Sequence, residues 1–479
     1  MAQSIKLKDE VEIIPVALVD QLRPTNNIRT RTFFIIEECL EQDALKSSLD
    51  CLIRDHWQKL GGRLRSQSRG NLLEYHVPKT FGRDSVLFRW SCQEYNNSID
   101  SVAQAIRAPP QDKGPVLLPS MKVVDSWFRP ADWPYHRSDE SPDDPLLFVH
   151  LSAFFDATVI CISMPHVLAD QMGLANIIKA WMGLLDGKEP SPMIGYDNDV
   201  LPGNHKVFAD YPKKETYQKG RQRLFRTGEY QLVMLPFISD IVFNAEEDPY
   251  IIFFPLRLIQ SLRQRHSKIL GSKYADFSRI SDGDIITAIV TKFARMNKGS
   301  PRTVALSQTI NLRGKIFELD EEQRDAYIHN CPQYATSRQR LDHSTSIGEI
   351  AYANRRAIEK AAGSRGIEIG MAVKREMVRR GQANHICEPF ERSYYVSNWC
   401  AAWKDLDFGP AVKNGGSVER KKPKFLVLGQ AGERKSPRRY SSFILSRTEE
   451  GYWVDFSTST AAMRLVREYL ARDPNLEHF

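Results

Sequence analysis

The chain has 479 residues, 42% of them hydrophobic and 26% charged, and 66 Lys and Arg against 59 Asp and Glu give it a net charge of +7. This is the composition of an ordinary globular protein, and it excludes a fibrous, collagen-like or broadly disordered chain. One hydrophobic core rarely organises this many residues, so two domains of roughly 200 residues each are expected. The mild positive excess suits a phosphorylated small molecule but does not indicate binding to nucleic acid.

Neither a secretory signal nor a membrane span is expected. The first twenty residues mix acidic and basic side chains and lack a continuous apolar segment. The most apolar later stretches, such as residues 251–260, are short and interrupted by Pro or Arg, well under the roughly 20 residues of a membrane-spanning helix. A cytoplasmic location is the resulting expectation.

The seven cysteines are odd in number, widely spread and never spaced as CxxC. We expect reduced thiols, without a disulfide framework or a zinc ribbon. The nearest metal-like pairs are His329 with Cys331 and His385 with Cys387, and both lack the further ligands that a site of about four ligands needs. No metal site is therefore predicted.

The first part of the chain alternates between helical and strand patterns. Apolar residues three and four apart predict an amphipathic helix over 43–60, with Asp43 placed to cap its start. Two apolar runs within 146–163 predict two buried strands joined by a tight turn. The second strand runs directly to His166, and a helical apolar stripe follows up to Gly187.

Residues 188–230 are rich in Pro, Gly and charge and have no sustained period. We interpret them as a crossover linker between an N-terminal domain, 1–187, and a C-terminal domain, 231–479. In the second domain, Ser281 with Asp284 three residues later predicts the capping box of a helix over 280–297. The other expected elements are strands over 230–237, 303–312, 393–399, 424–430, 440–447 and 451–457, and helices over 255–266 and 461–473.

Strands and helices alternate irregularly in both halves, which favours an α/β arrangement with mixed sheets over a doubly wound parallel sheet. The chain contains no GxGxxG, GxxxxGK, GxSxG or HExxH string. Nucleotide-binding loops, serine-hydrolase elbows and zinc-protease helices therefore lose their usual sequence basis.

Of the eleven histidines, only His166 has an aspartate four residues later, Asp170. In a chain with this many histidines, such a spacing arises by chance about half the time. The position of His166 is more informative, because a residue between a buried strand and a helix is held rigidly at the edge of a cleft. The alternative is a satisfied core histidine at a strand–helix turn.

Motifs along nearly the whole chain resemble those of the BAHD family of plant and fungal acyltransferases. This family belongs with chloramphenicol acetyltransferase and the condensation domains of peptide synthetases. The matching segments, in chain order, are His166 to Asp170 for HxxxD, 281–284 for the middle segment, Asn311 to Arg313 for NxR, Asn330 for a later Gly-Asn element, Ser397 to Trp399 for S-x-W and Asp407 to Gly409 for DFGWG.

Two positions depart from the family pattern. Gln171 stands where a Gly usually follows the HxxxD aspartate, although Gly173 is kept. The last motif reads Asp407-Phe408-Gly409-Pro410-Ala411, and the resemblance implies a structural role for Asp407 and Gly409. This kind of divergence is similar to the fungal branch, which includes trichothecene O-acetyltransferases.

The resemblance implies two chloramphenicol-acetyltransferase-like domains with an active-site channel at their interface. His166 would act as general base, because an alcohol attacks a thioester only as its proton is removed and the pKa of His lies near working pH. Asp170 would pair with Arg313 in a structural role instead of orienting His166. Ser397 or Trp399 would stabilise the oxyanion, although both could equally be packed strand residues.

The basic stretch 413–424 includes Lys413, Arg420, Lys421 and Lys422. These side chains could hold the phosphates of coenzyme A, and a solvated loop is the alternative. The resemblance further implies a monomer with no permanently bound cofactor, which takes acetyl-CoA or another acyl-CoA as co-substrate. The implied acceptor is a hydroxyl on a fungal terpenoid or meroterpenoid.

Two rival functions stay open. A condensation-like former of amides or esters on carrier-bound substrates would keep the fold, but such domains usually carry a second His where this chain has Pro165. A catalytically idle homologue that only binds a ligand is the other rival, and the intact His166 argues against it.

Overall fold

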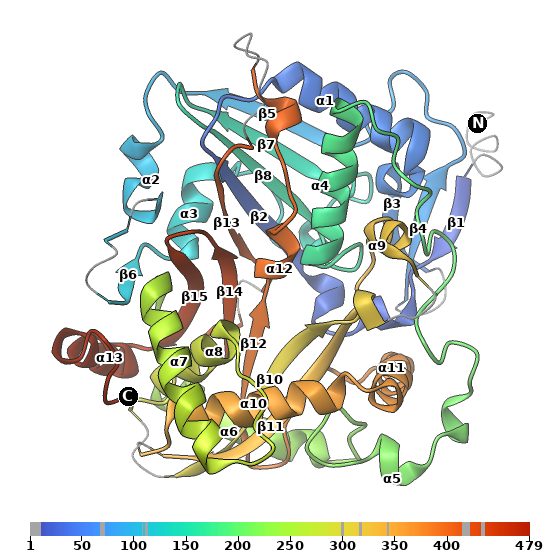
Figure 1. The fold of residues 1–479 in the computed structure, drawn as a ribbon. Coiled ribbons are helices and arrows are strands. Elements are labelled where there is room, and N and C mark those ends of the chain that lie inside the picture. The colour runs from blue at the N-terminus through green and yellow to red at the C-terminus, as the bar shows by residue number, and fades with distance from the viewer. Residues whose placement is uncertain are drawn as a thin grey trace.

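The structure is a computed structural model that describes residues 11–479, apart from 68–71, 108, 111–113, 298–300, 316–318, 343, 414–421 and 433–435. Its two halves are built on two large sheets, one above the other in Figure 1. The upper sheet has the order β13-β2-β8-β7-β5 and the lower sheet β11-β10-β12-β14-β15-β9-β6, and a small β1-β4-β3 sheet flanks the upper half.

The strands of the upper half and of the small sheet come mainly from the first third of the chain. They are β1 (Val11–Pro15), β2 (Arg29–Ile36), β3 (Arg63–Ser66), β4 (Leu73–Pro78), β5 (Arg89–Glu94), β7 (Phe148–Ala153), β8 (Thr158–Pro165) and β13 (Phe425–Gln430). Those of the lower sheet are β6 (Val116–Leu118), β9 (Glu247–Pro255), β10 (Arg302–Asn311), β11 (Pro332–Leu341), β12 (Arg392–Asn398), β14 (Ser441–Arg447) and β15 (Gly451–Ser459).

Both large sheets are mixed. In the upper sheet β5 and β7 are parallel, while β13, β2, β8 and β7 pair antiparallel in turn. In the lower sheet β10, β12 and β14 run parallel and the remaining pairs are antiparallel. The predicted α/β arrangement with mixed sheets is confirmed.

Each half lends a strand to the other. The late strand β13 pairs with β2 in the upper sheet, and the early strand β6 pairs with β9 in the lower sheet. As a result, Trp399, Trp403, Phe408 and Val427 are buried in the core cluster of the upper half. The two halves therefore share hydrogen-bonded sheet and packed core as well as a chain crossover.

The helices cover the faces of these sheets. Those before the crossover are α1 (Gln42–Cys51), α2 (Asp100–Arg107), α3 (Met121–Phe128) and α4 (Gln171–Leu185). The later ones are α5 (Lys213–Thr216), α6 (Glu229–Phe243), α7 (Leu256–Lys273), α8 (Asp282–Phe293), α9 (Glu321–Asp325), α10 (Ile347–Ala361), α11 (Ser364–Arg379), α12 (Cys400–Trp403) and α13 (Thr460–Arg472).

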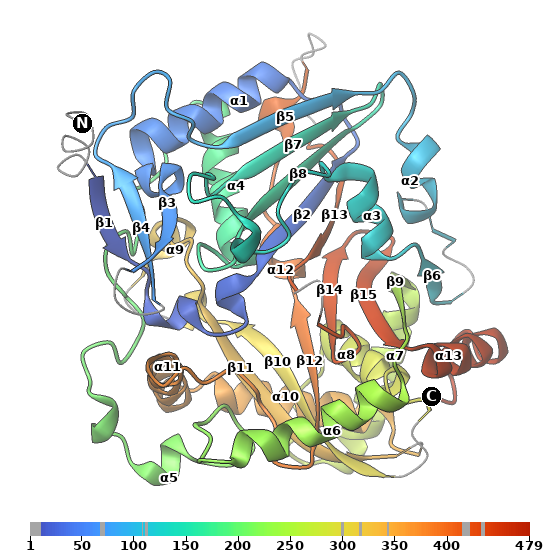
Figure 2. The same cartoon turned by 180° about the vertical axis from the view of Figure 1, so that it is seen from behind.

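Alternation along the strands assigns each helix to a face. In β2, the Phe33 ring packs against Phe128 of α3, and the neighbouring Phe34 ring contacts Trp403 on the other face. In β10, Leu306 joins the core that α7, α8 and α10 build, whereas Ala305 faces Phe237 of α6. Accordingly α6 lies across the face of the lower sheet that is turned to the viewer in Figure 2.

Most predicted elements are confirmed within a few residues. The two strands within 146–163 are β7 and β8, and the helix after His166 is α4. The capping box at Ser281 is present, since its side chain accepts from the Asp284 N–H while the Asp284 carboxylate accepts from the Ser281 N–H. The strands predicted over 303–312, 393–399, 424–430, 440–447 and 451–457 correspond to β10, β12, β13, β14 and β15, and the helices over 255–266 and 461–473 to α7 and α13.

The strand predicted over 230–237 is wrong, because these residues lie in the helix α6. The run is nearly all apolar, so its period cannot separate a strand from a helix. Its buried residues Val233, Phe237 and Asp240 lie three and four apart, which is the spacing of one helix face.

The predicted cap of the first helix is also wrong. The helix α1 begins at Gln42 with Glu41 as its N-cap residue, so Asp43 lies in the first turn instead of capping it. A carboxylate there still interacts favourably with the helix dipole. Beyond α1 the chain continues as a π-helical turn over Leu52–His56, which covers most of the remaining predicted length.

Residues 188–228 form no strand and contain only short helical turns, at Phe208–Asp210 and Lys213–Thr216. In Figure 1 this green segment runs down one edge of the molecule from α4 towards α5. The division of the chain at this crossover stays a prediction, because two strands cross between the halves.

Candidate active site

His166 stands at the end of β8, where the chain turns from the upper sheet into α4. Its backbone is held on both sides: its N–H donates to the Ile28 carbonyl over 2.8 Å, and its carbonyl accepts from Asn330 Nδ2 over 2.8 Å. Ile28 precedes β2 in the upper half and Asn330 precedes β11 in the lower half. His166 therefore sits where the two halves meet and is fixed by both.

The ring of His166 is partly exposed, with its Nδ1 buried. Burial lowers the pKa of His166 below its usual 6.5, although the nearby Asp170 carboxylate acts in the opposite direction. An imidazole with a lowered pKa is uncharged at neutral pH, and an uncharged imidazole can accept a proton.

Asp170 forms a bidentate ion pair with Arg313, as predicted. Arg313 Nη2 lies 2.9 Å from Asp170 Oδ1, and Arg313 Nη1 lies 3.1 Å from Asp170 Oδ2. Asp170 Oδ2 also accepts from the Cys331 N–H over 3.1 Å. The Arg313 side chain is 4% exposed, and it donates further to the carbonyls of Tyr327 and His329. Burial opposes the charge of Arg313, but Asp170 together with Cys331 and Tyr327 more than offsets burial, so that the pKa of Arg313 is raised.

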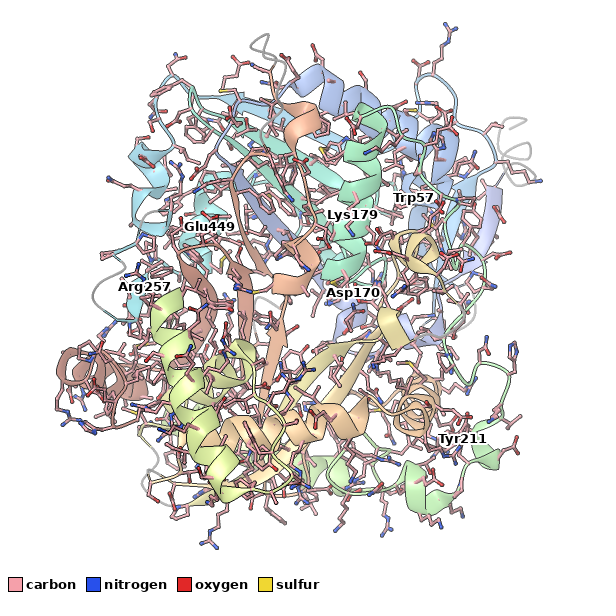
Figure 3. All side chains as sticks on the ribbon, viewed as in Figure 1. Trp57, Asp170, Lys179, Tyr211, Arg257 and Glu449 are labelled. Carbon is pink, nitrogen blue, oxygen red and sulfur yellow. The ribbon has the colours of Figure 1, made fainter. Side chains whose placement is uncertain are left out.

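Asp170 is also the N-cap residue of α4. Its Oδ1 accepts from the Gly173 N–H over 2.8 Å, which satisfies one of the free amides of the first turn. Figure 3 shows Asp170 between the two halves of the molecule, at the lower end of α4. With both oxygens engaged by α4, Arg313 and Cys331, this carboxylate ties the first half to the second.

The first turn of α4 needs a glycine at position 173, because the chain of the lower half passes very close to it. A Cβ atom at this position would lie 1.7 Å from the carbonyl oxygen of Ile328, which is backbone and cannot rotate away. Only glycine lets α4 approach the segment that carries His329 and Asn330 this closely.

Ser397 and Trp399 lie at the end of β12 and are both buried. The Trp399 indole N–H donates to Ser397 Oγ over 3.1 Å. The indole is thus already used within the pair, while the Ser397 hydroxyl keeps its own proton to donate. The indole of Trp399 thereby fixes the orientation of the Ser397 side chain. Which of the two would serve an oxyanion stays a prediction.

The strands β10 and β12 are neighbours, and their register brings the S-x-W segment beside the NxR segment. Gln308 pairs with Val396 in parallel, so one more step along each strand sets Thr309 level with Ser397. Both strands end towards Asn311 and Trp399, on the side where Arg313 reaches Asp170. The HxxxD, NxR and S-x-W segments therefore converge on one seam between the halves.

The Asp407–Gly409 turn is stabilised by its own hydrogen bond and packs on the upper sheet. Asp407 Oδ1 accepts from the Gly409 N–H over 2.9 Å, and the Phe408 ring packs 5.7 Å from that of Phe34 in β2. These contacts attach the turn to the upper sheet, and no polar group of this turn is directed to His166 by the contacts described.

The basic residues predicted to hold coenzyme A are only partly described. Arg420 and Lys421 fall in 414–421, outside the described residues, and Lys422 is exposed. The Lys413 N–H donates to the carbonyl of Cys39. Cys39 is tied by its Sγ to the turn that precedes β8. The eight-residue strand β8 separates that turn from His166 by roughly 25 Å.

Sequence reasoning missed a buried polar group behind His166. His329 Nδ1 lies 3.1 Å from the Leu168 carbonyl, and His329 Nε2 lies 3.1 Å from the Lys59 ammonium. Burial, followed by the charge of Lys59, holds the pKa of His329 well below its usual value, and burial lowers that of Lys59 to about 8. Lys59 and His329 are 270 residues apart, so no local spacing could have indicated the contact.

Within the described ranges, no group of three or more His, Cys, Asp or Glu residues is arranged to hold a metal ion. None of the helices described has both the length and the apolar character needed to cross a membrane.

No protein-family model matches the chain. Acetyltransferase pyiB of Pyricularia grisea is 23% identical to it, with 96% of this chain and 93% of that protein covered. Acetyltransferase adrJ of Penicillium rubens is 26% identical, with 90% of each covered. A relative from Penicillium decumbens, 25% identical with 96% of each covered, bears the name transcriptional regulator calD.

Two solved structures share the fold. TRI101 of F. sporotrichioides, complexed with coenzyme A and T-2, is 13% identical with a TM-score of 0.68, over 96% of this chain and 97% of that chain. Vinorine synthase is 18% identical with a TM-score of 0.57, over 97% and 93%. The likeness extends along both halves, so the two-domain BAHD fold predicted from the motifs is confirmed.

Proposed function

We propose that this chain, an acyltransferase with the two-domain BAHD fold, transfers the acetyl group of acetyl-CoA to a hydroxyl of a small molecule with His166 as general base. One observation carries the proposal: His166 is held by backbone contacts from both halves. Burial lowers the pKa of His166, which favours the uncharged form that can accept a proton. Because Nδ1 is the buried nitrogen, Nε2 is the one assigned to the reaction.

The reaction begins with proton removal. His166 Nε2 accepts the proton of the acceptor hydroxyl as its oxygen bonds to the thioester carbonyl carbon. The tetrahedral intermediate then collapses, the carbon–sulfur bond breaks, and the sulfur of coenzyme A takes the proton from His166. The products are an ester and free thiol, without a covalent acyl-enzyme and without a permanently bound cofactor.

Ser397 is the proposed donor to the oxyanion of that intermediate. Its Oγ accepts the indole N–H of Trp399, and its hydroxyl, which also lies within hydrogen-bonding reach of Tyr395, can donate to the developing charge. Asp170 takes no part in proton transfer in this proposal, because both its oxygens are engaged by α4, Arg313 and Cys331. Lys413, Arg420, Lys421 and Lys422 stay candidates for holding the phosphates of coenzyme A.

The proposed acceptor is a hydroxyl on a specialised fungal metabolite of terpenoid or meroterpenoid type, and the proposed active species is a monomer. The support is indirect: the relatives pyiB and adrJ are named acetyltransferases and come from fungi. TRI101, whose fold the chain shares, was crystallised with coenzyme A.

The test is to incubate the purified full-length chain with acetyl-CoA and fractions of a fungal metabolite extract. We expect thiol release together with a product heavier by one acetyl group in mass spectra. The His166→Ala variant is the matched control, and a gain of product that survives this substitution would contradict the proposed base.

The name of calD keeps one alternative in view, a homologue that binds a ligand without turning it over. Such a protein would bind coenzyme A or a metabolite in calorimetry and release no thiol with any acceptor. A condensation-like activity would instead appear only with carrier-bound acyl groups. Comparing free acetyl-CoA with carrier-bound donors separates the three functions.

A further inference from the structure

The helix α6 exposes an apolar face to solvent. Half of the large hydrophobic side chains exposed by the described residues lie in this one helix, and the most exposed are Val242 at 68% and Phe243 at 82%. Leu235, Ile238 and Val242 lie three and four apart and form a continuous stripe. Phe390 adds to it, because its N–H donates to the Leu232 carbonyl and its ring is exposed.

No charged side chain interrupts this stripe. The only charged residues of α6 are Glu229, which pairs with Arg223, and Asp240, which is buried. Apolar surface of this extent and without charge marks an interaction site on an ordinary soluble domain.

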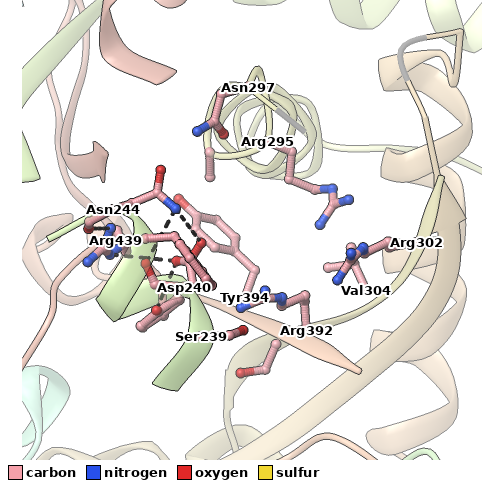
Figure 4. A pocket seen from close by; sticks show the side chains of 14 residues that line it. Ser239, Asp240, Asn244, Arg295, Asn297, Arg302, Val304, Arg392, Tyr394 and Arg439 are labelled. Atoms are coloured by element: carbon pink, nitrogen blue, oxygen red, sulfur yellow. Dashed lines mark hydrogen bonds and ion pairs between the residues drawn. The ribbon is translucent and has the colours of Figure 1, made fainter. Parts of the chain in front are cut away.

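The stripe ends at a pocket of about 430 Å³ lined with arginines. Phe243 and Asn244 contribute to its lining. The guanidinium groups come from the turn after α8, the start of β10, the start of β12 and the segment before β14. These groups are Arg295, Arg302, Arg392 and Arg439, and Figure 4 shows them around one space.

The positive charge of this pocket is largely unbalanced. Four guanidinium groups and one carboxylate, Asp240, line it, which gives a formal sum of +3. Arg439 pairs with Glu247 at 3.0 Å and with Asp240 at 3.8 Å. None of the ion pairs found among the described residues involves Arg295, Arg302 or Arg392, and Arg295 Nη2 is buried without a hydrogen-bond partner.

The pocket is remote from the acyl-transfer seam. It opens at Arg302, where β10 starts, whereas Arg313 and Asp170 meet just beyond Asn311, where β10 ends. Nine steps of about 3.3 Å separate the two ends of this strand by roughly 30 Å. The arginines of the pocket are therefore no part of the site built around His166.

We propose that α6 and this arginine pocket dock the protein on a membrane surface that carries anionic phospholipids. A phosphate or carboxylate headgroup matches the guanidinium groups in charge and in hydrogen-bond geometry. The adjoining uncharged stripe of α6 matches the apolar boundary beneath the headgroups, into which exposed apolar side chains of a surface helix can be buried. A second copy of the chain fits less well, because its own stripe is bordered by an equally positive pocket.

The experiment is co-sedimentation of the full-length protein with vesicles of phosphatidylcholine, with and without phosphatidylserine. We expect partitioning at least about tenfold stronger on the phosphatidylserine vesicles, and weaker at high salt, because screening reduces charge attraction at a surface. For the double variant Arg295→Gln, Arg302→Gln, binding to the phosphatidylserine vesicles should fall to the level seen with phosphatidylcholine alone. The double variant Ile238→Ser, Val242→Ser should bind more weakly to both kinds of vesicle.

Two exposed residues elsewhere supply matched controls, Arg83→Gln for charge and Val86→Ser for apolar surface, and both should bind vesicles like the unchanged protein. Unchanged melting temperatures would show that all variants are folded. Absence of vesicle binding overturns the proposal, and so does binding of inorganic phosphate by the pocket without any vesicle binding. A dimer in solution that Ile238→Ser dissociates would assign the stripe to a second copy of the chain instead.

Discussion

At the scale of single residues, removing the His166 side chain should slow the reaction. A positioned base contributes on the order of a hundredfold to ten-thousandfold to the rate, so His166→Ala should lower kcat by that factor. Folding should be little affected, because the contacts that hold His166 are made by its backbone. Steady-state kinetics with a melting curve of the same sample check both parts, and a fully active His166→Ala protein would remove the proposed base.

The protonation of His166 predicts the pH dependence. Burial lowers the pKa of His166, and the base form exists above that pKa. The rate constant kcat/KM should therefore fall as the pH drops through a value below 6.5, and stay flat through neutral pH. A pH profile of kcat/KM tests this, and a midpoint clearly above 6.5 would contradict the assignment.

The ion pair between Asp170 and Arg313 predicts a loss of stability when either partner is removed. Breaking a buried pair leaves an uncompensated charge and costs about 3–5 kcal/mol of unfolding free energy. Asp170→Asn and Arg313→Gln should each lower the melting temperature. The double variant should lose less unfolding free energy than the two single variants lose when their losses are added. An Asp170→Asn protein as stable as the parent and as inactive as His166→Ala would instead make Asp170 the partner of His166 in a catalytic dyad.

The motif segments could be recognised in the sequence because each is short and they follow one another in a fixed order. Spacing alone could not choose between Ser397 and Trp399, since that choice depends on which atom the indole proton reaches. The contact of Lys59 with His329 could not be predicted at all, because it joins two ordinary residues through the tertiary fold.

At the scale of elements, Gly173 predicts how closely α4 must approach the lower half. Gly173→Ala would set a Cβ atom against the Ile328 carbonyl, so α4 must shift at a cost of about 1–3 kcal/mol, and activity should fall with it. Gly183→Ala in the same helix is the matched control, since its nearest neighbour would lie 3.8 Å away. There we expect a gain of roughly 0.5–1 kcal/mol, as for most glycines inside helices. Urea unfolding measures both, and equal effects at the two positions would refute the close approach.

Elements in which apolar residues recur at a clear spacing could be predicted from the sequence. The helix α6 could not, because its apolar residues show no such spacing. Both strands around residue 155 and the capped helix at Ser281 carry explicit signals at their ends. In α6 the exposed side is as apolar as the buried one, so the sequence lacks the polar face that identifies a helix.

At the scale of the whole molecule, the crossover and the exchanged strands predict different outcomes for cleavage and for separation. Limited proteolysis should cut first within 188–230, where short turns replace regular structure. The two pieces should nevertheless remain together on size exclusion, because β13 is paired with β2 and β6 with β9.

Separate expression of 1–230 and 231–479 should accordingly give unstable proteins that recover solubility only when produced together. The first piece would expose the edge of β2, and the second would expose the apolar side chains that the upper core normally buries. Two independently folded monomeric fragments would contradict this. The exchange of strands could not be predicted from the sequence, since pairing between distant strands leaves no local pattern.

The exchange of β13 and β6 also limits how the molecule can move. Rotating one half away from the other about a hinge would break the ladder between β13 and β2 and expose the buried Phe408 and Val427. We therefore expect the two halves to stay together through turnover, without a domain closure that encloses the reactants. On this expectation, the choice of acceptor depends on the side chains along the seam, and redesign of that choice belongs with them.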